Sequence, residues 1–191
     1  MASLVLSGDT SGSITVSAPA VAGSTTQTLV NVTGTLAPVV SGTAVSASGT
    51  SVDFTGIPSW VKRITVSITD VSFAAAGAAR LRLGTSGGLV SSGYVASSTG
   101  LTTAPTISVT SVTDGLAAIN TGGSATVATG QFIIVNITGN TWQSSGFVTR
   151  LADSVTSFAT GYIALSGTLD RLSVVATTST FDAGTINIIY E

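Results

Sequence analysis

Apolar and polar residues alternate along most of the chain with a period of two. Between residues 63 and 69, Ile64, Val66 and Ile68 alternate with basic and hydroxyl residues. Three further segments show the same alternation, at 80–83, 171–174 and 185–190. This period directs one set of side chains into a core and the other toward solvent, and the abundant Val, Ile and Thr suit pleated strands. The pattern therefore predicts β-strands along most of the chain.

Turn-forming residues separate these predicted strands. Clusters of Gly, Asn, Asp and Pro recur roughly every 8 to 15 residues, a spacing typical of all-β sandwiches. The clusters are Gly56-Ile57-Pro58, Ser86-Gly87-Gly88, Thr113-Asp114-Gly115, Thr121-Gly122-Gly123, Thr138-Gly139-Asn140 and Asp182-Ala183-Gly184. The clearest hairpin runs along Gln131–Ile137, turns at Thr138–Thr141 and returns along Trp142–Arg150. The Ala-rich run around Gly77 is compatible with one short helical turn or with a loop between strands, and the loop is favoured.

The fold class predicted from these signals is all-β, with a jelly-roll-like antiparallel β-sandwich preceded by an extended N-terminal arm. The periodicity fits other Greek-key sandwiches equally well. In the last strand, Ile186, Ile188 and Tyr190 form one apolar row. Such a strand is expected to be central in its sheet, since a free edge with a fixed apolar row invites pairing with other chains.

Residues 1–47 form the predicted arm and residues 48–191 the predicted sandwich. The first 47 residues contain no aromatic residue and one charged residue, Asp9, so they cannot close a core of their own. They are a flexible linker or an arm whose apolar rows, Leu4 with Leu6 and Ile14 with Val16, are buried by a neighbouring chain. The regular spacing of the large apolar residues favours the arm.

Composition excludes several functions. Hydrophobic residues make up 43% of the chain and charged residues 7%, with six Lys and Arg in total. Nucleic-acid binding is not expected, because phosphate contacts need clustered basic residues. The chain has no Cys and no His, which removes the commonest acid–base and zinc-ligating side chains. No apolar run approaches the length of a membrane span, so a chain made in a cytoplasm, without membrane insertion, is expected.

Several segments resemble virion proteins of tailed bacteriophages. LSGDTSGSITV (6–16) followed by APAVAG (18–23) resembles a short module of tail-fibre and other virion proteins. The body of the chain resembles a phage domain that is found at fibre ends and in small stand-alone virion proteins. Its matching pieces are VDFTGIP (52–58), KRITV (62–66), SGY (92–94), GNTW (139–142), SGTLDR (166–171) and FDAGTINIIYE (181–191). The arm departs from the module after Leu29, where Val30-Asn31-Val32 replaces the usual Pro and Ala.

The resemblance implies a non-enzymatic structural protein of the virion, made in the host bacterial cytoplasm. It implies a homotrimer, and the nearly uncharged surface offers little repulsion against such packing. The leading role is a tail-fibre or fibre-tip adhesin with host-surface polysaccharide as a candidate ligand. The alternative is a head fibre or capsid decoration protein that attaches to the major capsid protein lattice through its arm. A polysaccharide-degrading spike is the third reading.

The search for reactive groups favours the first two roles. The acids are widely spaced and mostly at turns, where Asp commonly bonds its own backbone, and we expect no catalytic pair, no metal site and no cofactor. Among the aromatic residues, Trp60, Tyr94, Trp142 and Tyr162 are candidates for stacking on sugar rings or for packing in the core. The selected candidate contacts with a glycan or partner are Trp142, Asn140, Gln143 and Tyr94. Arg80, Arg82, Arg150 and Arg171 are expected to face solvent or to pair with Asp153 and Asp170.

Overall fold

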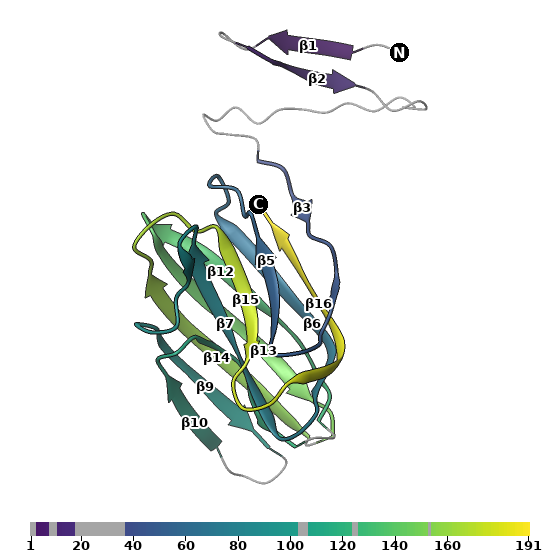
Figure 1. Cartoon of the computed structure of the whole chain (residues 1–191), viewed down its shortest axis with the longest axis vertical. Coiled ribbons are helices and arrows are strands. Elements are labelled where there is room, and N and C mark those ends of the chain that lie inside the picture. The colour runs from purple at the N-terminus through teal and green to yellow at the C-terminus, as the bar shows by residue number, and fades with distance from the viewer. Residues whose placement is uncertain (1–2, 8–10, 18–36, 103–106, 124–125, 153) are drawn as a thin grey trace. The chain divides into compact units, whose positions relative to one another are not determined.

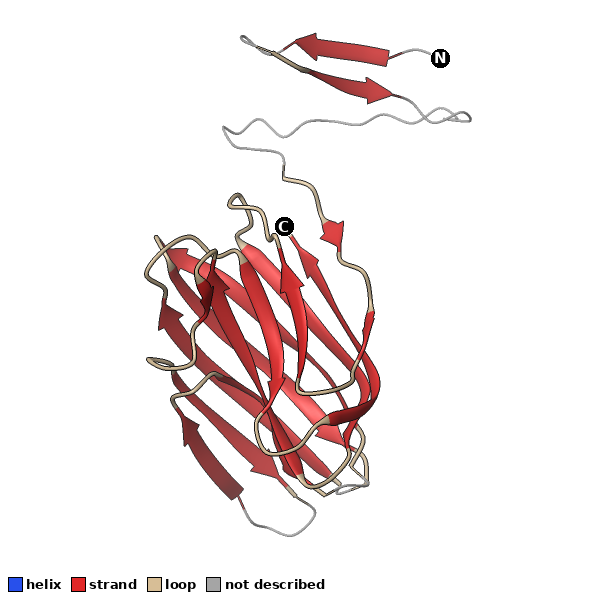
Figure 2. Ribbon diagram, in the orientation of Figure 1, coloured by secondary structure: helices blue, strands red, loops and turns tan. Residues whose placement is uncertain are grey.

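The computed structural model describes residues 3–7, 11–17, 37–102, 107–123, 126–152 and 154–191. The chain divides into two compact units, Met1–Leu36 and Ala37–Glu191. Strands and loops make up the described residues, and Figure 2 shows no helix among them. Consequently, no helix in these residues has the length and apolar character needed to cross a membrane.

Unit 1 contains an antiparallel hairpin of β1 (Ser3–Ser7) and β2 (Ser13–Ser17). Leu4 pairs with Val16 and Leu6 pairs with Ile14, so the two predicted apolar rows lie on one face of the hairpin. We call these four side chains the hairpin row. All four are more than half exposed, with 54% to 68% of their surface accessible. The predicted course of residues 18–36 lies outside the described residues.

Unit 2 is an antiparallel β-sandwich of a large and a small sheet (Figure 1). Across the nine-stranded large sheet, the order is β10 (Ile107–Val112), β9 (Val95–Leu101), β14 (Val155–Ala164), β13 (Thr141–Arg150), β12 (Ala128–Thr138), β6 (Arg63–Phe73), β16 (Phe181–Tyr190) and β3 (Val40–Ser41), with β4 (Val45–Ser46) also paired with β16. Across the five-stranded small sheet, the order is β11 (Leu116–Gly122), β7 (Gly77–Thr85), β15 (Arg171–Ala176) and β5 (Ser51–Thr55), with β8 (Gly88–Leu89) paired with β7. The all-β antiparallel sandwich is confirmed, and the jelly-roll connectivity stays a prediction.

One hydrophobic core fills the space between the sheets. Leu81, Leu83 and Leu172 from the small sheet and Phe132 and Ile134 from the large sheet are fully buried in it. The predicted alternation in β6 is confirmed, because the apolar positions 64, 66 and 68 are at most 1% exposed while positions 63, 65, 67 and 69 face outward. Burying each such side chain contributes about 1.5–3 kcal/mol.

The predicted hairpin at 131–150 is confirmed as β12 and β13. Thr138 pairs with Thr141 across a two-residue turn of Gly139 and Asn140. Gly139 has a φ of 50°, which glycine adopts without the steric cost that a Cβ atom would impose. The Ala-rich run around Gly77 forms a loop only at residues 74–76, because β7 begins at Gly77 and already includes Ala78 and Ala79.

The predicted turn at Asp182-Ala183-Gly184 is wrong. These residues lie inside β16, where the pairing with β6 shifts twice and the strand bulges but continues. Gly184 has a φ of 99°, and opposite it Asp70 has a φ of 53°. Gly and Asp therefore provide positive φ angles for a pair of facing irregularities within the sheet.

Unit 2 begins eleven residues before the predicted boundary at 47/48. β3 and β4 pair with β16, and Ala47 is 2% exposed in the core. Residues 37–47 thus cover the outer edge of β16 (Figure 1). β16 is accordingly flanked by β6 on one side and by these two short strands on the other. This agrees with the central position predicted from its apolar row of Ile186 and Ile188.

Candidate functional site

The outer faces of the two sheets differ in charge. The ion pairs of Asp114 and Asp170 lie on the small sheet and its flanking loops, whereas the pair of Arg63 and Glu191 lies at the ends of β6 and β16 in the large sheet, outside strands β9, β10, β12, β13 and β14. The Asp114 carboxylate lies 3.3 Å from the guanidinium group of Arg80 and 3.3 Å from that of Arg82. The guanidinium group of Arg171 lies 2.9 Å from the Asp170 carboxylate, as predicted. Arg150 is 8% exposed and its expected partner, Asp153, lies outside the described residues. Exposed pairs of this kind stabilise a fold by at most about 1 kcal/mol each.

The large sheet presents an uncharged outer face over five adjacent strands, β9, β10, β12, β13 and β14. On β9, β12, β13 and β14 the outward side chains alternate mostly with buried ones, whereas on the edge strand β10 residues 107–111 are all exposed. The outward side chains consist of hydroxyl, amide, aromatic and aliphatic groups. We call this surface the neutral face. Its side chains are Val95, Ser97, Thr99, Leu101, Ile107, Val109, Ser111, Gln131, Ile133, Val135, Gln143, Ser145, Phe147, Thr149, Thr156, Phe158, Thr160 and Tyr162.

Several large apolar side chains on the neutral face remain accessible. Phe147 and Phe158 pair across β13 and β14 with ring centroids 6.5 Å apart, and each is about half exposed. Val109, which lies in the same cross-strand row beyond Thr99, is 66% exposed. A contiguous arrangement of accessible apolar groups with no charge among them is typical of a contact surface.

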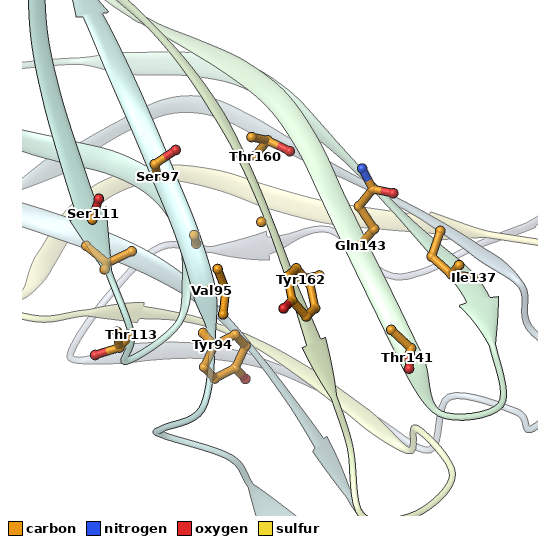
Figure 3. Close-up of a pocket in the computed structure, with 13 residues that line it drawn as sticks. Tyr94, Val95, Ser97, Ser111, Thr113, Ile137, Thr141, Gln143, Thr160 and Tyr162 are labelled. Atoms are coloured by element: carbon orange, nitrogen blue, oxygen red, sulfur yellow. The ribbon is translucent and has the colours of Figure 1, made fainter.

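A shallow hollow of about 700 Å³ lies at one end of the neutral face. Its centre is a cross-strand row in which Gln143 pairs with Tyr162 and Tyr162 pairs with Val95. Figure 3 shows Tyr162 between Val95 and the side chains of Gln143 and Thr141. Tyr162 is 49% exposed and Val95 is 56% exposed, so an aromatic ring and an aliphatic group form accessible parts of the wall.

Polar groups without protein partners accompany this apolar surface. Among the described residues, neither the amide of Gln143 nor the phenol of Tyr162 makes a hydrogen bond within the protein. The Thr160 hydroxyl donates to the Ser144 carbonyl at 3.1 Å, which leaves its oxygen able to accept another hydrogen bond. Ser97 and Thr141 add two further hydroxyls to the wall. The hollow can therefore offer an apolar ring face together with uncharged donors and acceptors.

The structure divides the four selected contact residues between two places. Gln143 and Tyr94 line the hollow, whereas Asn140 and Trp142 line a separate cavity of about 140 Å³ beside Lys62 and Asn136. Trp142 is 4% exposed, which removes its ring from any stacking contact with an external ligand. Its Nε1 donor has no acceptor among the described protein groups.

Tyr94 is a structural residue of the hollow's floor. It is 1% exposed, and its hydroxyl accepts a hydrogen bond from Leu83 N–H at 2.8 Å. The same oxygen lies 3.0 Å from the Val90 carbonyl and 3.2 Å from the Leu83 carbonyl, and its single proton can be donated to either of them. Burial disfavours the charged phenolate and raises the pKa of Tyr94 to about 12. The hydrogen bond from Leu83 N–H and the nearby Arg82 lower this pKa, but their effects are smaller than that of burial.

Tyr162, one of the four aromatic candidates, lines the hollow although the four selected contact residues do not include it. The alternation in residues 155–164 predicts that Tyr162 faces outward. Phe158, Thr160 and Tyr162 are two residues apart and share one face of the strand, whereas the buried Ile163 lies on the other face. Trp60 is also accessible, with 40% of its surface exposed. Its ring packs against that of Tyr190, with the two ring centroids 5.9 Å apart.

The described carboxylates bond to the protein itself. Asp53 accepts from the hydroxyls of Ser51 and Ser173, and Asp70 accepts from Thr129. Asp182 accepts from Ser72, and Glu191 pairs with Arg63. Within the described residues, no group of three acidic, His or Cys side chains is placed to hold a metal ion.

A comparison with models of known protein families finds no match for this chain, and a search of curated proteins finds no match either.

Proposed function

We propose that this protein is a non-enzymatic structural protein on the surface of a tailed-phage virion, of the tail-fibre or fibre-tip type. The observation that carries this proposal is the neutral face, which spans five strands and exposes Phe147, Phe158 and Tyr162 without a charged side chain among its members. A rigid sheet that exposes aromatic and hydroxyl groups is suited to contact other surfaces. The phage-like segments supply the biological setting.

The bonding of the carboxylates supports a role without catalysis. A glycosidase needs two carboxyl groups that flank one bond, about 5–10 Å apart. Here the described acids are each bonded to a different strand or loop, as Asp53, Asp114 and Asp182 illustrate. These partnerships give the carboxylates a role in connecting strands.

The proposal includes assembly as a homotrimer. A fibre-like assembly built by cyclic symmetry closes through head-to-tail contacts, and a surface with little charge favours close approach. Light scattering of the full chain at micromolar concentration should give the mass of three chains. A mass of one chain would contradict this part of the proposal.

The alternative role is a head fibre or capsid decoration protein that binds the major capsid protein lattice through the arm. The hairpin row favours it, because an isolated two-stranded hairpin with four exposed apolar residues is marginal in water. Packing of that row on another virion protein would stabilise it. The prediction is that removal of unit 1 abolishes attachment of the sandwich to virions.

The test is the protein composition of purified particles from the phage that encodes this chain. Mass spectrometry of intact particles and of separated heads and tails should detect the chain in the tail fraction. Detection in the head fraction would establish the alternative role. Absence from every particle fraction, with expression confirmed in the infected host, would overturn both roles.

A further inference from the structure

We infer that the hollow at Gln143, Tyr162 and Val95 binds a neutral saccharide. The inference deepens the proposed function and rests on it for the source of the ligand, a polysaccharide of the host surface. The argument for the ligand's chemistry comes from the walls of the hollow alone.

The first step concerns size. About 700 Å³ falls within the range of roughly 300–1,000 Å³ that small-molecule sites occupy. Gln143 and Val95 flank Tyr162 on neighbouring strands, so the row spans two inter-strand spacings, about 10 Å. That length accommodates a disaccharide unit laid across the strands.

The second step concerns the apolar wall. A pyranose has one face of C–H groups, which packs on an aromatic ring, while its hydroxyls point outward around the ring. Tyr162 is half exposed in the centre of the row, and Val95 and Ile137 extend its apolar surface on either side. These groups provide a platform for the C–H face of one sugar ring and for its neighbour.

The third step concerns the polar groups. The Gln143 amide supplies two donors and an acceptor, and the Tyr162 phenol supplies a donor and an acceptor, with no protein partner for either among the described residues. The hydroxyls of Thr160 and Ser97 lie along the same wall. Groups that both donate and accept match sugar hydroxyls, which do the same.

The fourth step concerns charge. Among the residues that the structure describes, no Lys, Arg, Asp or Glu side chain lines the hollow. A sulfated or carboxylated saccharide would find no cation to compensate its desolvation, which disfavours it relative to a neutral one. The lining therefore selects a neutral ligand.

A second copy of the chain fits the hollow less well. Two copies related by a two-fold axis would bring the same concave patch together and leave unfilled volume, whereas stable interfaces pack as densely as protein interiors. A saccharide chain can follow the concave wall, and we assign the hollow to it. A head-to-tail trimer contact that filled the hollow instead would be disrupted by Tyr162→Ala, so the oligomeric state of that variant distinguishes the two occupants.

The test uses the full-length protein and a panel of neutral oligosaccharides, namely glucan, mannan, galactan, rhamnan and N-acetylglucosamine tetramers to hexamers, with oligogalacturonate as the anionic comparison. Saturation-transfer NMR would identify binding, and calorimetry would give Kd. We expect at least one neutral oligosaccharide to bind with a Kd of about 1 mM or tighter, and oligogalacturonate to bind more weakly.

Four variants locate the site. Tyr162→Ala should weaken binding at least about tenfold and Gln143→Ala a few-fold, as expected for a central aromatic and a flanking amide. Tyr162→Phe keeps the ring and should cost only a few-fold, so it tests the site even if Tyr162→Ala folds poorly. Leu89→Ala is the control, because Leu89 is 40% exposed on β8 of the small sheet, outside the hollow and the neutral face, and it should bind normally.

Three outcomes would overturn the inference. They are the absence of binding by every neutral oligosaccharide at about 10 mM, equal binding by Tyr162→Ala and the unmodified chain, and conversion of an oligomer into monomers by Tyr162→Ala. If particles contain the protein but no sugar binds, the proposed function stands and the ligand assignment fails. If a sugar binds but particles lack the protein, the ligand assignment stands and the virion role fails.

Discussion

Replacing Tyr94 by Phe removes one buried oxygen and leaves the ring in place. That oxygen accepts a hydrogen bond from Leu83 N–H at 2.8 Å and can donate to the Val90 carbonyl at 3.0 Å. The Leu83 carbonyl also accepts from Val90 N–H at 2.9 Å, so the hydroxyl completes the pairing between β7 and the segment after β8. In the variant, the buried Leu83 N–H loses its acceptor.

The expected cost is about 1–3 kcal/mol of unfolding free energy, the usual penalty for leaving a buried polar group without its partner. For a domain of this size, each kcal/mol lowers the melting temperature by about 2–4 °C. Differential scanning calorimetry at pH 7 measures the shift. Tyr162→Phe is the control, because its phenol makes no hydrogen bond within the described residues, and its free energy of unfolding should change by less than about 0.5 kcal/mol.

The same residue makes stability depend on pH above neutrality. The pKa of Tyr94 is about 12 in the folded protein, whereas an unfolded tyrosine titrates near 10. The folded state therefore holds this proton over a range in which the unfolded state has released it. The resulting stabilisation is complete below about pH 10 and is lost as the pH rises toward 12, by up to about 2–3 kcal/mol.

The comparison of the two proteins isolates this contribution. The difference in melting temperature between the unmodified protein and Tyr94→Phe should be constant from pH 7 to about 9 and should shrink toward pH 12. A variant as stable as the unmodified protein at pH 7 would refute the hydrogen-bonding role assigned to Tyr94. A gap that stayed constant to pH 12 would refute the effect of burial on the pKa of Tyr94.

Three further predictions concern the sheet edge and the arm. Ile188→Ala should cost about 2–5 kcal/mol because Ile188 is 3% exposed in the core. Asn187→Ala removes the 3.4 Å hydrogen bond to the Ser41 hydroxyl and the side-chain acceptor of Ile188 N–H at 2.8 Å, and it should cost about 1 kcal/mol; equal melting shifts would contradict the register of β16. Gly184→Ala should cost about 2–4 kcal/mol of unfolding free energy, because its φ is 99° and a Cβ atom would lie 2.5 Å from the β6 backbone. Gly100→Ala is the control: its Cβ atom would have its nearest contact at 3.6 Å, and urea unfolding should show almost no change in stability. Removal of unit 1 should leave the melting temperature of the sandwich unchanged, and a deletion that also takes β3, β4 and Ala47 should lower it; equal melting temperatures for the two deletions would contradict the assignment of these strands to unit 2.

Sequence reasoning succeeded where a local pattern determines the structure. The alternation around Ile64 and Val66 identified β6, because a one-residue shift in register would have exposed the whole row. Gly139-Asn140 identified the hairpin, because the turn needs a positive φ at a defined position between two strands. Both signals lie within a few residues of the feature that they predict.

Reasoning from the sequence failed where a partner distant in sequence determines the structure. Asp182-Ala183-Gly184 has the composition of a turn, and only the facing Asp70 on β6 makes it a bulge. Residues 37–47 lack aromatic groups and resembled the arm, yet the edge of β16 requires a covering strand. The position of Trp142 on the hairpin suggested a ring open to a ligand, but the alternation along β13 directs that ring into the core.

The measurement that tests the central claim most directly is immunogold electron microscopy of phage particles with antibodies raised against unit 2. We predict gold at the distal end of the tail, and labelling there should disappear when the gene for this chain is deleted. Gold over the head would support the capsid-decoration role in place of the fibre-tip role. Particles that carry no gold, although the same antibodies detect the chain in the infected host, would contradict the virion function proposed for this protein.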